Sequence, residues 1–168
     1  KTIVITGASS GIGYSTCELF LEKGYHVFGS VRKKNDAKAL LKSFGSNFTP
    51  LLIDVTNNTS IQISKDIVKD RLQGANLTAL INNAGIAVLG PLEYLQISAF
   101  RSQLETNLTG TLMCVQAFLP LLGTDKTCFG PPGRIINISS ALGGKIGYPF
   151  YGAYCSSKHA LEGLSEAL

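Results

Sequence analysis

The chain has 168 residues, of which 45% are hydrophobic, and a formal net charge of +4. That length supports one large buried core, so we expect a single domain over residues 1–168. The dispersed basic residues exclude a nucleic-acid-binding footprint, and no apolar run is long enough to cross a bilayer. No secretory signal is recognisable, so we expect a cytoplasmic protein, while an N-terminal anchor or targeting segment before Lys1 stays open.

Apolar runs typical of strands alternate with helical patterns along the whole chain, and no linker or repeat interrupts them. Ile3-Val4-Ile5 is apolar without alternation, which indicates a strand covered on both faces. The pattern predicts an α/β fold with a doubly wound parallel sheet in three α/β/α layers. The predicted strands are 2–6, 26–31, 49–54, 79–82 and 134–139, and the predicted helices are 12–23, 35–44, 60–72, 98–122 and 153–168.

The first strand is followed by a glycine-rich segment, Thr6-Gly7-Ala8-Ser9-Ser10-Gly11-Ile12-Gly13. Its glycines let the backbone turn sharply into a helix and let a phosphate approach amides that no β-carbon shields. The spacing differs from the common G-x-G-x-x-G fingerprint, so an ordinary strand-to-helix turn is the alternative.

A second signal is Tyr154-Cys155-Ser156-Ser157-Lys158, within the last predicted helix. Residues four apart share one helix face, so this spacing places a phenol beside an ammonium. The ammonium favours the phenolate, which can then exchange a proton with an alcohol or carbonyl oxygen. Tyr151 has Cys155 rather than a lysine four residues later. An exposed helix pair without chemistry is the alternative for Tyr154 and Lys158.

The four cysteines are far apart and fit neither a metal-site spacing nor a disulfide framework. We expect free thiols in a reducing compartment and no metal site.

Together these segments resemble the short-chain dehydrogenase/reductase family, whose TGxxxGxG and YxxxK motifs they match. Four further segments follow the family order, and the matches run from Thr6 to Lys158. They are Asp54-Val55, Asn82-Asn83-Ala84-Gly85, Asn107 within 105–110, and Ile135-Ile136-Asn137-Ile138-Ser139-Ser140.

The resemblance implies a Rossmann-type sheet and a dinucleotide cofactor at the carboxyl ends of its strands. It implies that Asp54 and Val55 border the adenine. An alternative for 82–85 is a strand cap and turn that stabilises the central sheet. The residues implied at the diphosphate are Gly7, Ser9, Ser10, Gly11, Ile12 and Gly13, and those at the adenosine ribose are Asn82, Ala84 and Gly85.

The end of the second strand favours NADP(H) over NAD(H), although NAD(H) stays possible. NAD-preferring enzymes place a carboxylate there, but this chain has no acid until Asp36. Arg32 can offer a fork of donors to a 2′-phosphate, helped by Ser30 and Lys33. A solvated run of basic residues is the alternative.

The resemblance also implies the catalytic roles. Tyr154 is the general acid/base, Lys158 supports it and holds the nicotinamide ribose, and Asn107 supports a proton-relaying water. Ser140 binds the substrate oxygen, with Ser139 as the alternative. We therefore predict an NADP-dependent oxidoreductase, of carbonyl reductase type, that moves a hydride between the nicotinamide and a carbonyl or secondary alcohol. A catalytically silent NAD(P)-binding regulatory protein is the alternative.

The resemblance further implies a small apolar carbonyl or alcohol substrate, which could be steroid-, retinoid- or lipid-like. Family members usually form homodimers or homotetramers, and they continue for some distance beyond the YxxxK helix. We therefore expect a homo-oligomer and a chain that is a fragment of a longer protein. The apolar side chains expected at a subunit interface are Leu112, Val115, Phe118 and Leu119.

Overall fold

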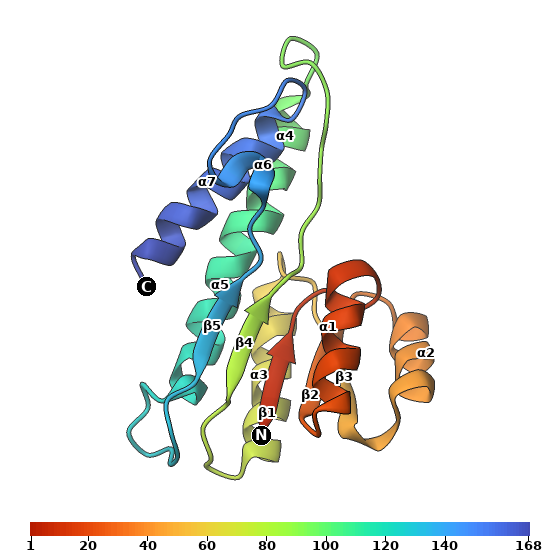
Figure 1. The fold of residues 1–168 in the computed structure, drawn as a ribbon, viewed down its shortest axis with the longest axis vertical. Coiled ribbons are helices and arrows are strands. Elements are labelled where there is room, and N and C mark those ends of the chain that lie inside the picture. Colours follow the sequence, from red (N-terminus) through yellow and green to blue (C-terminus); the bar gives the residue numbers. More distant parts are fainter.

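Five parallel strands form one sheet in the computed structural model, which describes residues 1–168 (Figure 1). The sheet order is β3-β2-β1-β4-β5, so the chain moves outward in one direction from β1 and then returns to pair β4 with the other side of β1. The strand order therefore reverses between the neighbouring strands β1 and β4. The strands are β1 (Thr2–Ile5), β2 (His26–Val31), β3 (Phe48–Leu52), β4 (Ala79–Asn82) and β5 (Arg134–Asn137).

Strand β1 shows why the sheet has helices on both faces. Ile3, Val4 and Ile5 are all fully buried, but Ile3 and Ile5 belong to one apolar cluster and Val4 to the other. Successive strand side chains point to opposite faces, so an apolar run without alternation requires two covered faces. This confirms the doubly wound, Rossmann-type fold that the pattern predicts.

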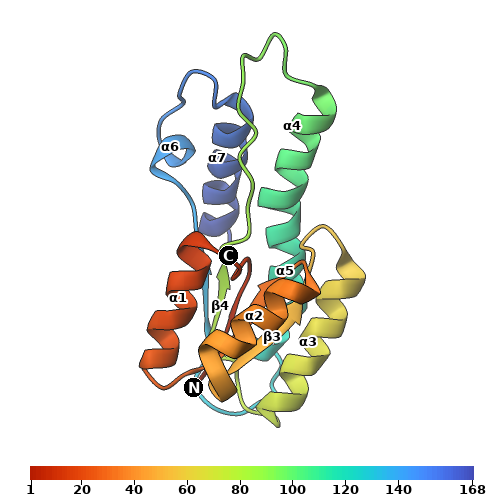
Figure 2. The ribbon, with the colours of Figure 1, turned by 90° about the vertical axis from the view of Figure 1, so that its right-hand side faces the viewer.

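Helices cover both faces of the sheet (Figure 2). Helices α3 and α5 pack on the face of Val4, and α1 and α2 on the face of Ile3. Helix α7 lies beyond the carboxyl end of β5, alongside α4 (Figure 1). The helices are α1 (Gly11–Glu22), α2 (Lys34–Phe44), α3 (Asn58–Leu72), α4 (Ile97–Leu104), α5 (Gly110–Phe118), α6 (Ala141–Gly144) and α7 (Gly152–Glu166).

The predicted strands and helices are all present, with ends displaced by at most two residues, but the helix over 98–122 is not one regular α-helix. A π-helical turn, Glu105–Thr109, joins α4 to α5, and a 3₁₀ segment, Leu119–Leu122, follows α5. Pro120 lacks the amide that an α-helix would use there, which accounts for the second change. The short helix α6 was not predicted.

The prediction that Val115 and Phe118 face a partner subunit is wrong. Val115 is 1% exposed and Phe118 is fully buried, and both belong to the core between α5 and the sheet. The apolar face of this helix is needed to cover the sheet of its own chain. Leu112 and Leu119 are partly buried.

All four cysteines are free thiols in this structure. Burial raises the pKa of Cys17 and of Cys114 to about 12 each. None of the helices combines the length and the apolar character that crossing a membrane requires.

Candidate active site

The glycine-rich turn connects β1 to α1 in a conformation that depends on two of its glycines. Gly7 has φ +71°, in the left-handed region that favours glycine. At Gly13 the restriction is steric, because a β-carbon there would lie 2.1 Å from the carbonyl oxygen of Gly7. The N-terminal end of α1 therefore packs directly on the turn, and the first amides of a helix have no acceptor within the helix.

The segment after β4 holds this turn in place. The Asn83 side-chain amide donates to the carbonyl oxygens of Thr6 and Gly7, both at 2.9 Å. The Thr6 hydroxyl accepts from the amides of Asn83 and Ala84, both at 3.0 Å. Asn82 is 4% exposed and donates to Asn137 on β5 at 2.9 Å. Asn82 and Asn83 therefore make the contacts that the strand-cap alternative describes, and Asn83, Ala84 and Gly85 also line a cavity.

This cavity has a volume of about 920 Å³ and lies at the carboxyl ends of β1 to β4, where the strand order reverses. Open α/β sheets bind their ligands at this position. Its lining residues come from five segments. They are Gly7, Ser9, Ser10 and Ile12; Ser30, Val31 and Arg32; Ile53, Asp54, Val55 and Thr56; Asn83, Ala84, Gly85 and Ile86; and Arg101, Ser102, Leu104, Glu105 and Thr106.

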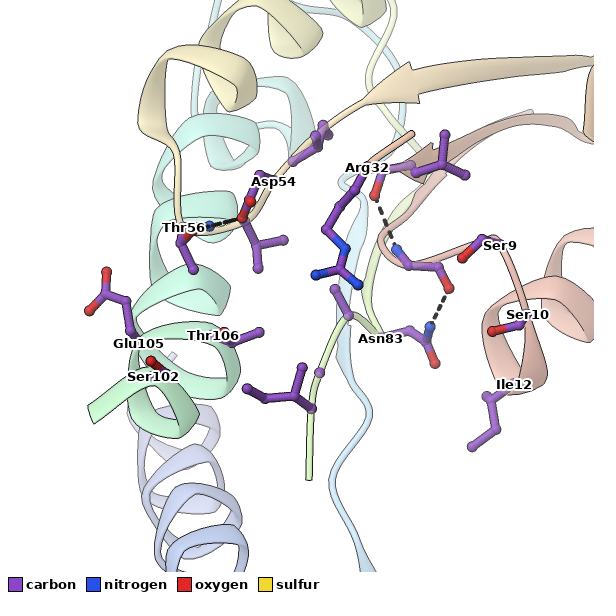
Figure 3. A pocket seen from close by; sticks show the side chains of 18 of the residues that line it. Ser9, Ser10, Ile12, Arg32, Asp54, Thr56, Asn83, Ser102, Glu105 and Thr106 are labelled. Carbon is purple, nitrogen blue, oxygen red and sulfur yellow. Dashed lines mark hydrogen bonds between the residues drawn. The ribbon is translucent and has the colours of Figure 1, made fainter. Parts of the chain in front are cut away.

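Arg32 and Asp54 carry opposite charges in the same cavity, and Figure 3 shows the Arg32 guanidinium projecting into the open space. Thr56 donates from its hydroxyl at 2.7 Å and from its amide at 2.9 Å to Oδ1 of Asp54. These two hydrogen bonds hold the pKa of Asp54 below its ordinary value, and the positive charge of Arg32 adds to this shift. Ser30 accepts from the Gly7 amide at 3.0 Å and so joins β2 to the glycine turn.

Behind the opposite wall, Asn107 lies in the π-helical turn and is 1% exposed. Its Oδ1 accepts from the Ile86 amide at 2.9 Å, and its Nδ2 donates to the Ile86 carbonyl oxygen at 3.0 Å. The same Nδ2 donates to the Ser157 hydroxyl at 3.1 Å, which in turn donates to the Tyr154 carbonyl oxygen at 2.7 Å. Asn107 therefore joins the cavity wall to α7.

Tyr154 and Lys158 share one face of α7, as their spacing predicts. The Lys158 Nζ lies 5.8 Å from the centre of the Tyr154 ring and donates to the Ile138 carbonyl oxygen at 2.7 Å. Lys158 is 6% exposed, and this burial lowers its pKa, while Glu162 one turn further along raises it. The lysine is thus held between the end of β5 and the helix.

Ser139 and Ser140 follow β5 but differ in environment. The Ser139 hydroxyl is buried without a hydrogen-bond partner and lies near the position that a β-carbon on Gly144 would take. Ser140 is partly exposed and precedes α6 with an extended backbone.

The structure gathers most of the residues predicted at a cofactor around one cavity, but it leaves some of them outside the lining. Gly13 and Asn82 are buried behind the walls, Gly11 is exposed at the start of α1, and Tyr154 and Lys158 lie on α7 beyond the Asn107 contacts. Sequence reasoning missed the cavity positions on α4 and the π-helical turn, from Arg101 to Thr106, except as neighbours of Asn107. It also missed Gln103, which the sequence could have indicated as an amide side chain one helical turn before Asn107.

Comparison with known proteins agrees with this geometry. The family model described as short chain dehydrogenase matches residues 1–168. The chain is 40% identical over 98% of its length to an NADPH-dependent 3-dehydrocapnine reductase of Ornithobacterium rhinotracheale, and 37% identical over its whole length to a 3-ketodihydrosphingosine reductase of Bacteroides thetaiotaomicron. It spans 58% and 57% of the length of these two relatives.

Solved structures show the same fold. A short-chain dehydrogenase from Streptomyces avermitilis superposes with a TM-score of 0.89 at 29% identity, over 99% of this chain and 58% of that chain. A structure described as ElxO with NADP bound superposes with a TM-score of 0.83 at 31% identity, over 98% of this chain and 64% of that chain. The chain therefore belongs to the short-chain dehydrogenase family.

Proposed function

We propose that the protein is an NADP-dependent oxidoreductase that moves a hydride between the nicotinamide and a carbonyl or secondary alcohol. One observation carries this proposal: the cavity at the strand-order reversal has the glycine turn and Arg32 on one side, and Asn107 connects its other side to Tyr154. This continuity supports the assignment of a nucleotide site and a proton donor to one active site.

The cavity suits a dinucleotide in size and in donor chemistry. Its volume of about 920 Å³ lies at the upper end of the range of small-molecule sites, roughly 300 to 1,000 Å³. Glycines and helix N-terminal amides on one side fit a diphosphate, because no side chain separates it from the backbone donors. When bound, the cofactor supplies the hydride donor or acceptor. We assign its contacts to Gly7, Ser9, Ser10, Gly11, Ile12, Ser30, Arg32, Asp54, Val55, Ala84 and Gly85, with Gly13 and Asn82 supporting them and Lys158 at the nicotinamide ribose.

We assign the preference for NADP(H) over NAD(H) to Arg32. Its guanidinium projects into the cavity (Figure 3), which Ser30 also lines, and a guanidinium matches the geometry of a phosphate group. The name of one relative, NADPH-dependent 3-dehydrocapnine reductase, and the NADP bound in ElxO agree with this choice.

For the proton we assign Tyr154 as donor in reduction and acceptor in oxidation. The Lys158 ammonium has three N–H groups, one of which donates to Ile138, so two are free to act toward Tyr154 and the cofactor. We assign the substrate-binding hydroxyl to Ser140, because the Ser139 hydroxyl is buried. Asn107 donates both of its side-chain amide hydrogens within the protein, to Ile86 and to Ser157. We therefore assign its side chain to hold the cavity wall, and we do not assign its side-chain amide to a proton-relaying water.

For the substrate we propose a carbonyl compound with an apolar body. The loop that contains Gly90 and the loop that contains Phe150, just before α7, lie side by side. The Gly90 amide donates to the Phe150 carbonyl oxygen at 2.8 Å. Large apolar side chains on these two loops are exposed, including Leu92 at 67% and Phe150 at 61%. The relatives named as reductases of 3-dehydrocapnine and 3-ketodihydrosphingosine indicate that the compounds to try first are of these two kinds.

The deciding experiment uses the full-length protein, NADPH and a panel of apolar ketones. We expect Tyr154→Phe to lower turnover by about 10²- to 10⁴-fold while its dissociation constant for NADP⁺ changes less than about twofold, because only the proton donor is lost. Tyr151→Phe removes a neighbouring phenol without a lysine partner and should retain turnover. Full activity of Tyr154→Phe would refute the mechanism, and nucleotide binding without any turnover would support the silent regulatory alternative.

A further inference from the structure

A second buried amide, Gln103, lies one helical turn before Asn107 and is fully buried. Placing a carboxamide in a protein interior costs free energy unless its donors and acceptor are satisfied. An apolar residue would fill the same space at lower cost, so the reason for a glutamine must be sought in its hydrogen bonds.

These hydrogen bonds go to the backbone of the segment that follows β4. Gln103 Oε1 accepts from the Val88 amide at 2.6 Å, and its Nε2 donates to the Ile86 carbonyl oxygen at 2.5 Å. A neighbouring strand would supply the same pair of contacts, one donor and one acceptor to residues two apart. Residues 83–89 have no strand partner of their own, so Gln103 takes the place of one.

Asn107 and Gln103 act on the same short segment. Positions four apart share a helix face, and both side chains reach Ile86, whose carbonyl oxygen accepts from the two amides together. Ile86 lines the cavity. The contacts of Asn107 continue through Ser157 to the Tyr154 carbonyl, whereas Gln103 fixes Val88, two residues beyond the wall residue Ile86.

We infer that Gln103 is a positioning residue: it fixes residues 86–88, of which Ile86 lines the nucleotide cavity, although Gln103 does not line the cavity itself. The inference rests on the proposed function, because the wall matters only if a nucleotide binds against it. Asn107 holds a single residue of the segment, Ile86, through its amide and its carbonyl, and Gln103 adds a second residue, Val88, which sets the direction of the segment.

The test compares Gln103→Met with the unaltered full-length protein. Methionine keeps the length and approximate volume of glutamine but makes neither hydrogen bond. We expect faster amide hydrogen exchange in residues 86–88 and roughly tenfold weaker NADP⁺ binding, the change that the loss of one or two buried hydrogen bonds produces. The matched control is Gln116→Met, at an exposed position on α5, which should change neither quantity.

Gln103→Glu supplies a conservative second variant. When protonated, a glutamic acid offers one O–H donor and one acceptor, as glutamine does here, but the ionised form cannot donate to Ile86. We therefore expect NADP⁺ binding by Gln103→Glu, relative to the unaltered protein at each pH, to recover as the pH is lowered. This rescue distinguishes positioning by these hydrogen bonds from a general effect on stability.

Two negative results have different meanings. If the unaltered protein binds NADP⁺ and Gln103→Met binds it equally well, with or without faster exchange at 86–88, Gln103 is only structural and the inference fails. If the unaltered protein binds neither NADP⁺ nor NADPH, the proposed function fails, and the positioning role fails with it.

Discussion

The two walls of the cavity obtain their shape from different parts of the chain. On the side of β1 and β2 the shape comes from the backbone, through the positive φ of Gly7 and the absence of a β-carbon at Gly13. On the side of α4 and α7 it comes from polar side chains: Gln103 and Ser157 are fully buried and Asn107 is 1% exposed. The first wall should therefore be sensitive to added volume, and the second to lost hydrogen bonds.

The largest effect is expected where volume is added to the first wall. Gly13→Ala places a β-carbon 2.1 Å from the Gly7 carbonyl oxygen, and backbone cannot move aside as a flexible side chain can. We expect the free energy of unfolding to fall by about 3 kcal/mol, the upper part of the range for overpacking. Urea unfolding of the variant measures this.

Gly163→Ala is the matched control for that change. Gly163 lies within α7, and a β-carbon there would meet nothing within 4 Å. Because alanine is the better helix former, we expect a gain of about 0.5 to 1 kcal/mol. Equal stability of the two variants would show that the turn adapts, and that its glycines are not a steric requirement.

The second effect tests what the first wall recognises. Arg32→Asp replaces the guanidinium in the cavity with a carboxylate that would repel a 2′-phosphate and could accept from ribose hydroxyls. We expect NADP⁺ binding to weaken by about 100-fold, since hydrogen bonds to charged groups contribute about 1.5 to 3 kcal/mol. Calorimetric titration with NADP⁺ and NAD⁺ measures both affinities.

Lys33→Asp makes nearly the same change in charge at the next residue, which is exposed and does not line the cavity. It should weaken NADP⁺ binding much less. Similar losses in both variants would mean that the basic segment acts through its overall charge, as the solvated-run alternative holds.

The same difference between the walls explains how much could be predicted from sequence. Backbone requirements restrict the residue type at a few consecutive positions, so the glycine turn is recognisable as a local pattern. The doubly wound parallel sheet also follows from the regular alternation of apolar runs and helices, whereas the strand order comes from the structure. The short helix α6 escapes prediction, because its inner residues Leu142 and Gly143 depart from helical dihedral angles.

The second wall depends on contacts between residues far apart in the chain. Gln103 bonds to residues 15 and 17 positions away, and Asn107 bonds to Ser157, 50 positions away. No local sequence pattern predicts a hydrogen-bond partner at such a distance along the chain. The π-helical turn at Glu105–Thr109 is missed in the same way, since it lies where Asn107 makes these distant contacts. Family resemblance identified Asn107 but not the reason for its orientation.

The third prediction concerns the two hydrogen bonds of the Ser157 hydroxyl behind the second wall. Ser157→Ala leaves Asn107 without one acceptor and the Tyr154 carbonyl without the Ser157 donor, both in a buried site. We expect the free energy of unfolding to fall by about 1 to 2 kcal/mol, within the range for an unsatisfied buried polar group. Its neighbour Ser156 is exposed and bonds only within its own helix, so Ser156→Ala should change stability by less than about 0.5 kcal/mol. Equal values would show that the Ser157 contact adds nothing measurable.

The smallest effect concerns the charge of Lys158. Burial lowers its pKa from 10.5, and Glu162 partly offsets this shift. As pH rises through that lowered pKa the ammonium is lost, so we expect turnover to fall on the alkaline side before pH 10.5 is reached. In Glu162→Gln this offset is lost, and the alkaline limb should move to lower pH.

Stability should respond with the opposite sign. The folded protein releases the Lys158 proton at a lower pH than the unfolded chain, so the free energy of unfolding rises with pH between the folded pKa and 10.5. Glu162→Gln should widen that interval, whereas Glu166→Gln, at an exposed position in the last turn of α7, should leave both profiles unchanged. If Glu162→Gln and Glu166→Gln give the same alkaline limb, Lys158 does not control it, and the second wall contributes hydrogen bonds to the site but no titrating charge.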